Sequence, residues 1–159
     1  MMKRRVVVKA KKDEVMFDID FISWKLAKCR IDNAEQQAEA QTDSEASDYI
    51  TRQIETAVMN AKGALHPYVV NDKGTLLDDE LTEEKEWFIV FEFGNEFAGS
   101  TPKLCNLFHR YIVDFALAEW FKLVLPNEAA NYYASAQDWL ERFKSEARTT
   151  IIQPPIFQL

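Results

Sequence analysis

Glycine is scarce in this chain, with four residues among 159. None of the four lies in a G-x-G-x-x-G or Walker pattern, so the sequence predicts no phosphate-binding loop. Cysteine is scarcer still: Cys29 and Cys105 are far apart and form no C-x-x-C pair, which favours reduced thiols. No signal peptide is visible, and no apolar run approaches the roughly 20 residues that span a membrane. We therefore expect a soluble, intracellular protein without a membrane partner.

Basic residues are fewer than acidic ones, 19 Lys and Arg against 26 Asp and Glu, and the net charge is −7. Sequence-specific or wrapping contact with nucleic acid needs clustered Lys and Arg, so this class of function is disfavoured. The charge is also uneven along the chain. The amino end is basic and residues 78–86 are acidic (Lys3, Arg4, Arg5, Lys9, Lys11 and Lys12 against Asp78, Asp79, Glu80, Glu83, Glu84 and Glu86). Such segments are usually solvated surface.

Apolar residues are plentiful, at 47% of the chain, and aromatic residues reach 13%. This content and length predict one domain with a substantial core, over residues 1–148, followed by an extended apolar tail, 149–159. Three segments have the β-branched and aromatic composition of strands: 4–9, 15–22 and 86–93. Segments 4–9 and 15–22 are expected to form an amino-terminal hairpin, because Phe17, Ile19 and Phe21 alternate with two aspartates.

Three longer segments have helical periodicity, at about 47–65, 102–125 and 127–148. The middle one is apolar on two faces, which predicts either a central position or burial by a second subunit. The expected fold is therefore α+β and mainly α: a three-helix bundle with a small antiparallel sheet built from the hairpin and one further strand.

The stretch VMFDIDFIS resembles the opening of haloacid-dehalogenase-type phosphatases, in which an aspartate that attacks phosphorus follows a buried strand. Asp18 and Asp20 would then serve a metal-dependent phosphotransferase. That chemistry needs further acidic, hydroxyl and lysine groups delivered by successive parallel strands. The chain offers one convincing later strand, 86–93, so we expect the two aspartates to lie on the solvent face of a strand.

Cys105 and His109 have the i, i+4 spacing of a helical ligand pair. Neither Cys29 nor His66 forms a matching pair with them, so a buried thiol and a packing or surface histidine are expected instead. The sequence thus predicts no catalytic residue, no metal site and no cofactor.

The carboxyl-terminal tail, TTIIQPPIFQL, combines two prolines, which exclude a helix, with large apolar side chains that are costly to expose. Such a tail is expected to dock, on its own domain or on a neighbouring copy. The predicted subunit contacts therefore lie on the second face of helix 102–125 and in the tail: Leu117, Trp120, Phe121, Val124, Ile151, Ile152, Ile156 and Phe157.

The last two helices, KLCNLFHRYIVDFALAEWF and NEAANYYASAQDWLERFKSEA, resemble those of bacteriophage head–tail connector proteins, also called adaptor or head-completion proteins. The resemblance rests on Asp114 to Ala118 at the centre of the first helix. In the second helix it rests on Glu128, then Tyr133, Ala136, Trp139 and Leu140. It covers about half of the chain, since neither the expected hairpin nor strand 86–93 has a counterpart.

The resemblance implies a non-enzymatic virion protein that forms a homo-oligomeric ring between the portal and tail proteins of a phage or prophage particle. Such a ring, assembled in the bacterial host cytoplasm, passes DNA without reading its sequence. An acidic chain suits this role, because carboxylates do not trap phosphates. Two alternatives remain open: the phosphotransferase using Asp18 and Asp20, and a small intracellular binding module.

Overall fold

The computed structural model describes residues 3–42, 45–70 and 85–150. Its elements follow in the order β1 (Arg4–Lys11), α1 (Lys12–Arg30), α2 (Ala34–Ala40), α3 (Ser47–Ala64), a single 3-10 turn η1 (His66–Tyr68), β2 (Glu86–Phe93), α4 (Thr101–Val124) and α5 (Pro126–Ala147). The fold is mainly α with a small antiparallel sheet, which confirms the expected fold class. Of the predicted tail, residues 151–159 lie outside the described residues.

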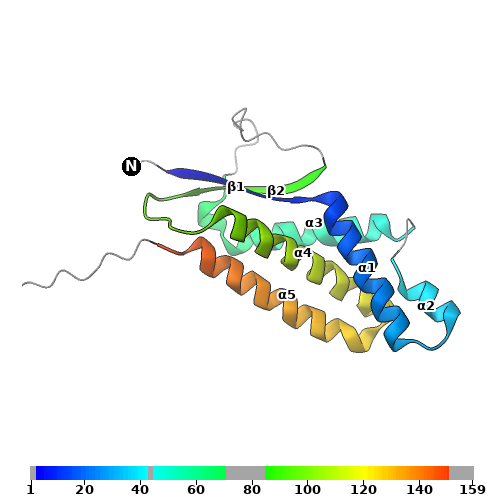
Figure 1. Cartoon of the computed structure of the whole chain (residues 1–159). Coiled ribbons are helices and arrows are strands. Elements are labelled where there is room, and N and C mark those ends of the chain that lie inside the picture. The colour runs from blue at the N-terminus through cyan, green and yellow to red at the C-terminus, as the bar shows by residue number, and fades with distance from the viewer. Residues whose placement is uncertain (1–2, 43–44, 71–84, 151–159) are drawn as a thin grey trace, which may run out of the picture.

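The sheet has two strands in the described part of the chain, and it lies across one side of the helices (Figure 1). β1 pairs antiparallel with β2 along its whole length, from Arg4 opposite Phe93 to Lys11 opposite Glu86. Alternate residues of β1 and β2 face the helices, and Val8 and Phe91 are fully buried there. The first strand therefore pairs with the strand predicted at 86–93, about eighty residues later, and not with residues 15–22.

Residues 15–22 are helical, so the predicted amino-terminal hairpin is wrong. They belong to α1, whose buried residues Val15, Ile19, Ser23 and Ala27 recur every fourth position. Acidic side chains in its first turn and basic ones in its last turn complement the helix dipole. The apparent alternation arose because α1 is apolar on two sides, one buried and one exposed. A helix with two interleaved apolar stripes resembles a strand over a short window.

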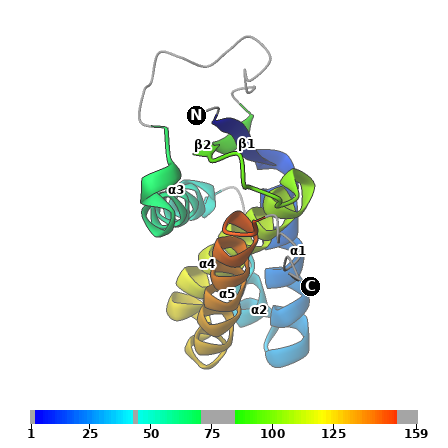
Figure 2. The same ribbon diagram turned by 90° about the vertical axis from the view of Figure 1, so that its left-hand side faces the viewer.

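Helix α4 lies at the centre of the bundle. It contacts α1, α2, α3, α5 and β1, and viewed along the bundle it stands between α3 and α1 with α5 beside it (Figure 2). Ser100 caps its first turn by accepting a hydrogen bond from the Lys103 amide, and Pro102 occupies the first turn, where no amide donor is needed. The central position explains why α4 is apolar on two faces.

Helix α5 returns antiparallel to α4 after a tight turn at Leu125. Small residues on its inner face, Ala129 and Ala136, allow the two backbones to approach closely, and Phe143 fills the far end of the interface. Glu128 in its first turn forms an ion pair with Arg30, at 3.1 Å, which links α5 to the end of α1. The predicted helices at 47–65, 102–125 and 127–148 are thus confirmed with small shifts at their ends.

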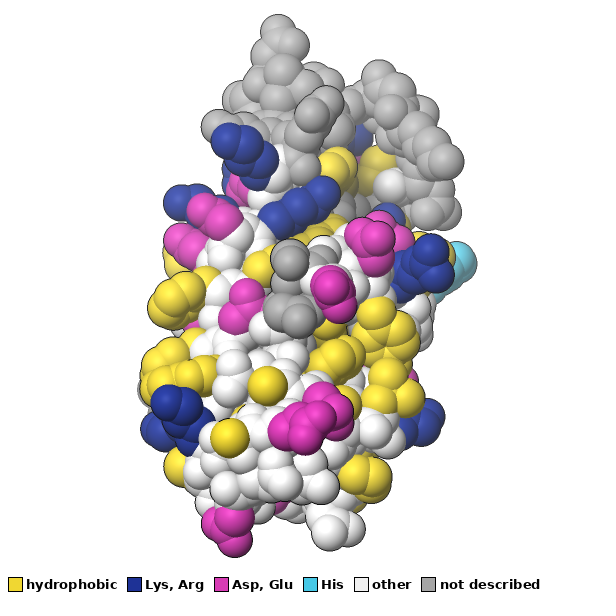
Figure 3. All heavy atoms as spheres, turned by 90° about the vertical axis from the view of Figure 1, so that its right-hand side faces the viewer, with side chains coloured by type: hydrophobic (Ala, Val, Ile, Leu, Met, Phe, Trp, Pro, Cys, Tyr) yellow, Lys and Arg dark blue, Asp and Glu magenta, His cyan; other side chains and the backbone are white. Residues whose placement is uncertain are grey.

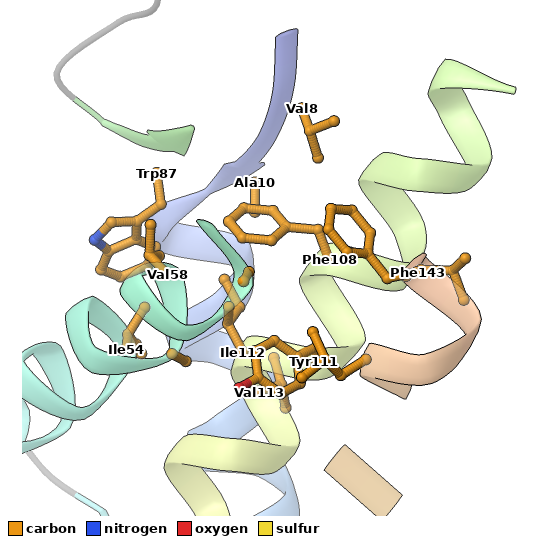
Figure 4. Close-up of a cluster of buried hydrophobic side chains, with 14 of the residues drawn as sticks. Val8, Ala10, Ile54, Val58, Trp87, Phe108, Tyr111, Ile112, Val113 and Phe143 are labelled. Atoms are coloured by element: carbon orange, nitrogen blue, oxygen red, sulfur yellow. The ribbon is translucent and has the colours of Figure 1, made fainter. Parts of the chain in front are cut away.

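The core lies where the sheet meets α3, α4 and α5. Figure 4 shows Val8 and Ala10 from β1, Trp87 from β2, Val58 from α3 and Phe108 from α4 pointing toward one another. Phe143 of α5 packs near Phe108, with ring centroids 6.2 Å apart. Within the described ranges, no helix is both long and apolar enough to traverse a bilayer.

Candidate functional site: a groove beside the aromatic face of helix α1

Three aromatic side chains stand in a row on the outer face of α1: Phe17, Phe21 and Trp24. They are 66%, 49% and 40% exposed. The Phe17 and Phe21 rings stack with centroids 6.2 Å apart, and Trp24 continues the row 6.1 Å from Phe21. Lys28 extends it by placing its ammonium 4.4 Å from the Trp24 ring. We call these three residues the aromatic row.

A groove of about 880 Å³ lies beside the aromatic row, between α1, the first half of α4 and the middle of α5, with the end of β1 at its border. Its apolar lining includes Phe21 and Ile22 from α1, Val113 from α4 and Trp139 from α5. Phe17 borders a smaller hollow that shares Asp18 and His109 with the groove. Phe17 and Phe21 therefore link the aromatic row to the groove.

An Asp18–His109 pair closes the groove on the α1 side. The Nε2 atom of His109 lies 2.6 Å from Oδ2 of Asp18, and this contact joins α1 to α4. The histidine side chain is 22% exposed and the aspartate side chain 44% exposed, so both remain in reach of water. The pair can bind a polar group that enters the groove.

A second polar group lies deeper, where α4 meets α5. One oxygen of Asp114, Oδ2, accepts hydrogen bonds from the Ser135 hydroxyl at 2.6 Å and the Trp139 indole at 2.9 Å. Burial raises the pKa of the Asp114 carboxyl, while these two hydrogen bonds and the charge of Arg110 act in the opposite direction. The network fixes the Trp139 ring, which forms the wall of the groove. Arg110 lies over that ring, 4.9 Å from its centroid.

The two aspartates of the phosphatase-like motif point to different places. Residues two apart on a helix are separated by about 200°, so Asp18 faces the groove while Asp20 does not. Asp20 instead accepts a hydrogen bond from the Thr42 hydroxyl, and Thr42 also bonds to the buried Ser23. The motif's context, two aspartates after a buried strand, is not present at these residues, because they lie within α1.

The Cys105 and His109 pair does lie on one side of α4, since both residues line the groove. The described residues contain no group of three or more His, Cys, Asp or Glu side chains placed to hold a metal ion. Cys29 lies exposed near the end of α1, and His66 lies in η1. Sequence reasoning placed Asp18 in the phosphatase-like motif and therefore missed it as the partner of His109.

The predicted subunit contacts on α4 have different surroundings from those expected. Leu117 and Phe121 are fully buried by their own chain, so they present no surface to a second copy. Trp120 and Val124 are partly exposed, and the Trp120 indole donates a hydrogen bond to the Ala40 carbonyl at 2.8 Å. The other four predicted contacts, Ile151, Ile152, Ile156 and Phe157, lie outside the described residues.

The aromatic row is a second feature that sequence reasoning missed. Phe17, Phe21 and Trp24 follow the i, i+4, i+7 spacing of one helix face, and this spacing was the available signal. From the side where α1 and α2 lie, the surface shows hydrophobic side chains in several patches between charged ones (Figure 3).

Comparisons of the chain with protein-family models, curated proteins and solved structures found no match.

Proposed function

We propose that this protein is a non-enzymatic virion assembly protein of a phage or prophage, a head–tail connector that acts as a homo-oligomeric ring. The observation that carries the self-association is the aromatic row beside the groove on α1. Large aromatic side chains exposed side by side are unfavourable in water and mark contact surfaces. The identity of the particle rests on the resemblance of α4 and α5 to connector proteins.

The size of this surface supports a protein partner. With exposures of 66%, 49% and 40%, the three rings expose roughly 300 Å², taking about 150–250 Å² for a whole aromatic side chain. A patch of this size is comparable to the largest apolar patch on a typical monomer, and such patches are often functional. A stable interface buries about 800 Å² on each partner, so the row would form its centre and the groove would supply much of the rest.

The partners that follow from the proposal are further copies of the chain and the portal and tail proteins on either side of the ring. DNA would pass through the ring without sequence-specific contacts. The net charge of −7 suits such a passage, because a predominantly acidic surface does not bind phosphates electrostatically. The assembly would form in the bacterial host cytoplasm and remain in the virion.

Mass photometry and negative-stain imaging of the full chain, alone at increasing concentration and with a portal protein, test the proposal. Rings, or a discrete multiple of the 18.5 kDa chain mass, are expected. A protein that stays monomeric under both conditions would contradict the connector proposal. The result would then favour the alternative of a small binding module that uses the same groove for another partner.

A further inference from the structure

We infer that the groove beside the aromatic row receives the carboxyl-terminal segment, residues 151–159, of a second copy of this chain. This inference rests on the proposed self-association and names the two surfaces that would meet. One surface is described above, and the other is given by the sequence IIQPPIFQL.

The chemistry of the segment matches that of the groove. Five of its nine residues are large and apolar, and none carries a charged side chain. Pro154 and Pro155 favour an extended polyproline conformation, and extended proline-containing segments dock into grooves lined by aromatic side chains. The groove offers such a lining, with Phe21 on one side and Trp139 on the other.

Hydrogen bonding provides a second match. The two prolines lack amide donors, so the segment has more carbonyl acceptors than N–H donors. The groove lining includes side chains that donate, namely Lys9 and Lys11 from β1 and Asn106 and Arg110 from α4, beside four carboxylates. The Arg110 Nε donates to Asn106, and its remaining guanidinium N–H groups can donate to a bound segment. Donors at this border can satisfy the surplus carbonyls of an extended segment, which makes no hydrogen bonds within itself.

The direction of the chain at Thr150 favours a second copy over the same chain. Thr150 pairs antiparallel with Phe97, and the Ala98 amide donates to the Thr149 carbonyl at 2.8 Å. Residues 97–100 lead into α4, so residues 149–150 run away from the start of α4. The groove lies further along α4, from Cys105 to Asp114. The tail of the same chain would therefore have to reverse direction after Thr150 to reach it.

A nine-residue segment is long enough to extend beyond its own chain. Nine extended residues span up to roughly 30 Å. A tail on one copy that enters a groove on the next is a head-to-tail contact, and such contacts close into a ring when the rotation between copies is suitable.

Sedimentation velocity on full-length variants tests the inference. Phe17→Gln with Phe21→Gln alters the groove side, and Ile156→Gln with Phe157→Gln alters the tail side. Each pair is expected to weaken self-association by about tenfold or more, as for the loss of central aromatic contacts. Met59→Gln is the matched control, because Met59 is 64% exposed on α3, nearly as much as Phe17 on α1. It should leave association unchanged.

Mixing the two double variants gives a sharper result. The groove variant retains a tail and the tail variant retains a groove, so one intact contact remains between them. A 1:1 dimer should appear in the mixture but in neither variant alone. The absence of that dimer would overturn the inference.

Photo-crosslinking from position 157 identifies the occupant of the groove. In a mixture of ¹⁴N- and ¹⁵N-labelled chains, the inference predicts mixed-isotope crosslinks to α1 or α4 peptides around the groove. Crosslinks within one isotope alone would show that each tail binds its own groove, and crosslinks elsewhere would show another docking site. Either result overturns the inference. The proposed function would fail separately, if the wild-type chain did not associate at all.

Discussion

Replacing Asp114 with alanine should destabilise the junction of α4 and α5. The substitution removes the acceptor of two hydrogen bonds, from Ser135 at 2.6 Å and from Trp139 at 2.9 Å. A hydrogen bond to a charged group contributes about 1.5–3 kcal/mol when it is well buried. Both donors here are partly exposed and can rebind water, so we expect a total loss of about 2 kcal/mol. For a domain of this size, this corresponds to a decrease in Tm of about 4–8 °C.

Asp114→Asn is the matched control. A single oxygen of Asp114 accepts both hydrogen bonds, and the amide oxygen of asparagine can replace it while the charge is removed. This variant should therefore lose less stability than Asp114→Ala. It also separates the hydrogen bonds from the cost of burying a charge.

The pH dependence follows from the raised pKa of Asp114, whose main cause is burial. A raised pKa means that the folded state holds a proton that the unfolded state has already released. The resulting stability is present below the unfolded value of about 3.9 and is lost as the pH rises through the folded value. The stability advantage of the wild type over Asp114→Asn should therefore decrease as the pH rises through this interval.

Urea unfolding followed by tryptophan fluorescence measures both effects, because Trp139 belongs to the network. The reasoning would be refuted if Asp114→Ala were as stable as Asp114→Asn. A difference between wild type and Asp114→Asn that stayed constant from pH 3.5 to neutral pH would refute the role assigned to burial.

Two further substitutions test the packing. Gly99→Ala should cost about 1–3 kcal/mol, because the new Cβ would lie 2.6 Å from the backbone oxygen of Glu146, which cannot move aside as a flexible side chain can. Gly94→Ala, with nothing within 4 Å of its Cβ, should change the free energy of unfolding by less than about 0.5 kcal/mol in the same denaturation assay. Trp120→Phe removes the indole hydrogen bond to the Ala40 carbonyl and should cost about 1 kcal/mol. It should also speed amide hydrogen exchange in α2, and unchanged exchange there would contradict the tethering role.

The long helices were predictable because each has a periodic apolar stripe and clear ends. α5 begins at Pro126, and its buried positions Ala136, Leu140 and Phe143 follow helical spacing. Strand β2 was predictable from its dense aromatic and β-branched residues. Its partner was not, because antiparallel pairing between segments about eighty residues apart depends on the whole fold and not on local pattern.

The error at residues 15–22 has a physical cause that bears on function. A helix with a polar outer face would have shown one stripe and would have been recognised. In α1 the outer face carries Phe17 and Phe21, so apolar residues alternate with Asp18 and Asp20 over a short stretch. Phe17 and Phe21, which made the helix resemble a strand, are the residues of the proposed contact surface.

The candidate site was predictable only in its parts. Asp18 and His109 each stood out in the sequence, but the two residues are ninety-one positions apart and lie on different helices. Leu117 and Phe121 were predicted to contact a second subunit, but they are buried within their own chain. Two apolar faces on α4 suggested a second subunit, whereas the chain's own α1, α3 and α5 surround the helix.

The mass of the wild-type protein beside that of Phe17→Gln/Phe21→Gln, measured by sedimentation velocity across a concentration series, tests the central claim most directly. We predict a discrete multiple of 18.5 kDa for the wild type and a shift toward the single chain for the variant. A wild type that sediments as a single chain at every concentration would contradict the proposed self-association. Equal association of the two proteins would contradict the role of the aromatic row.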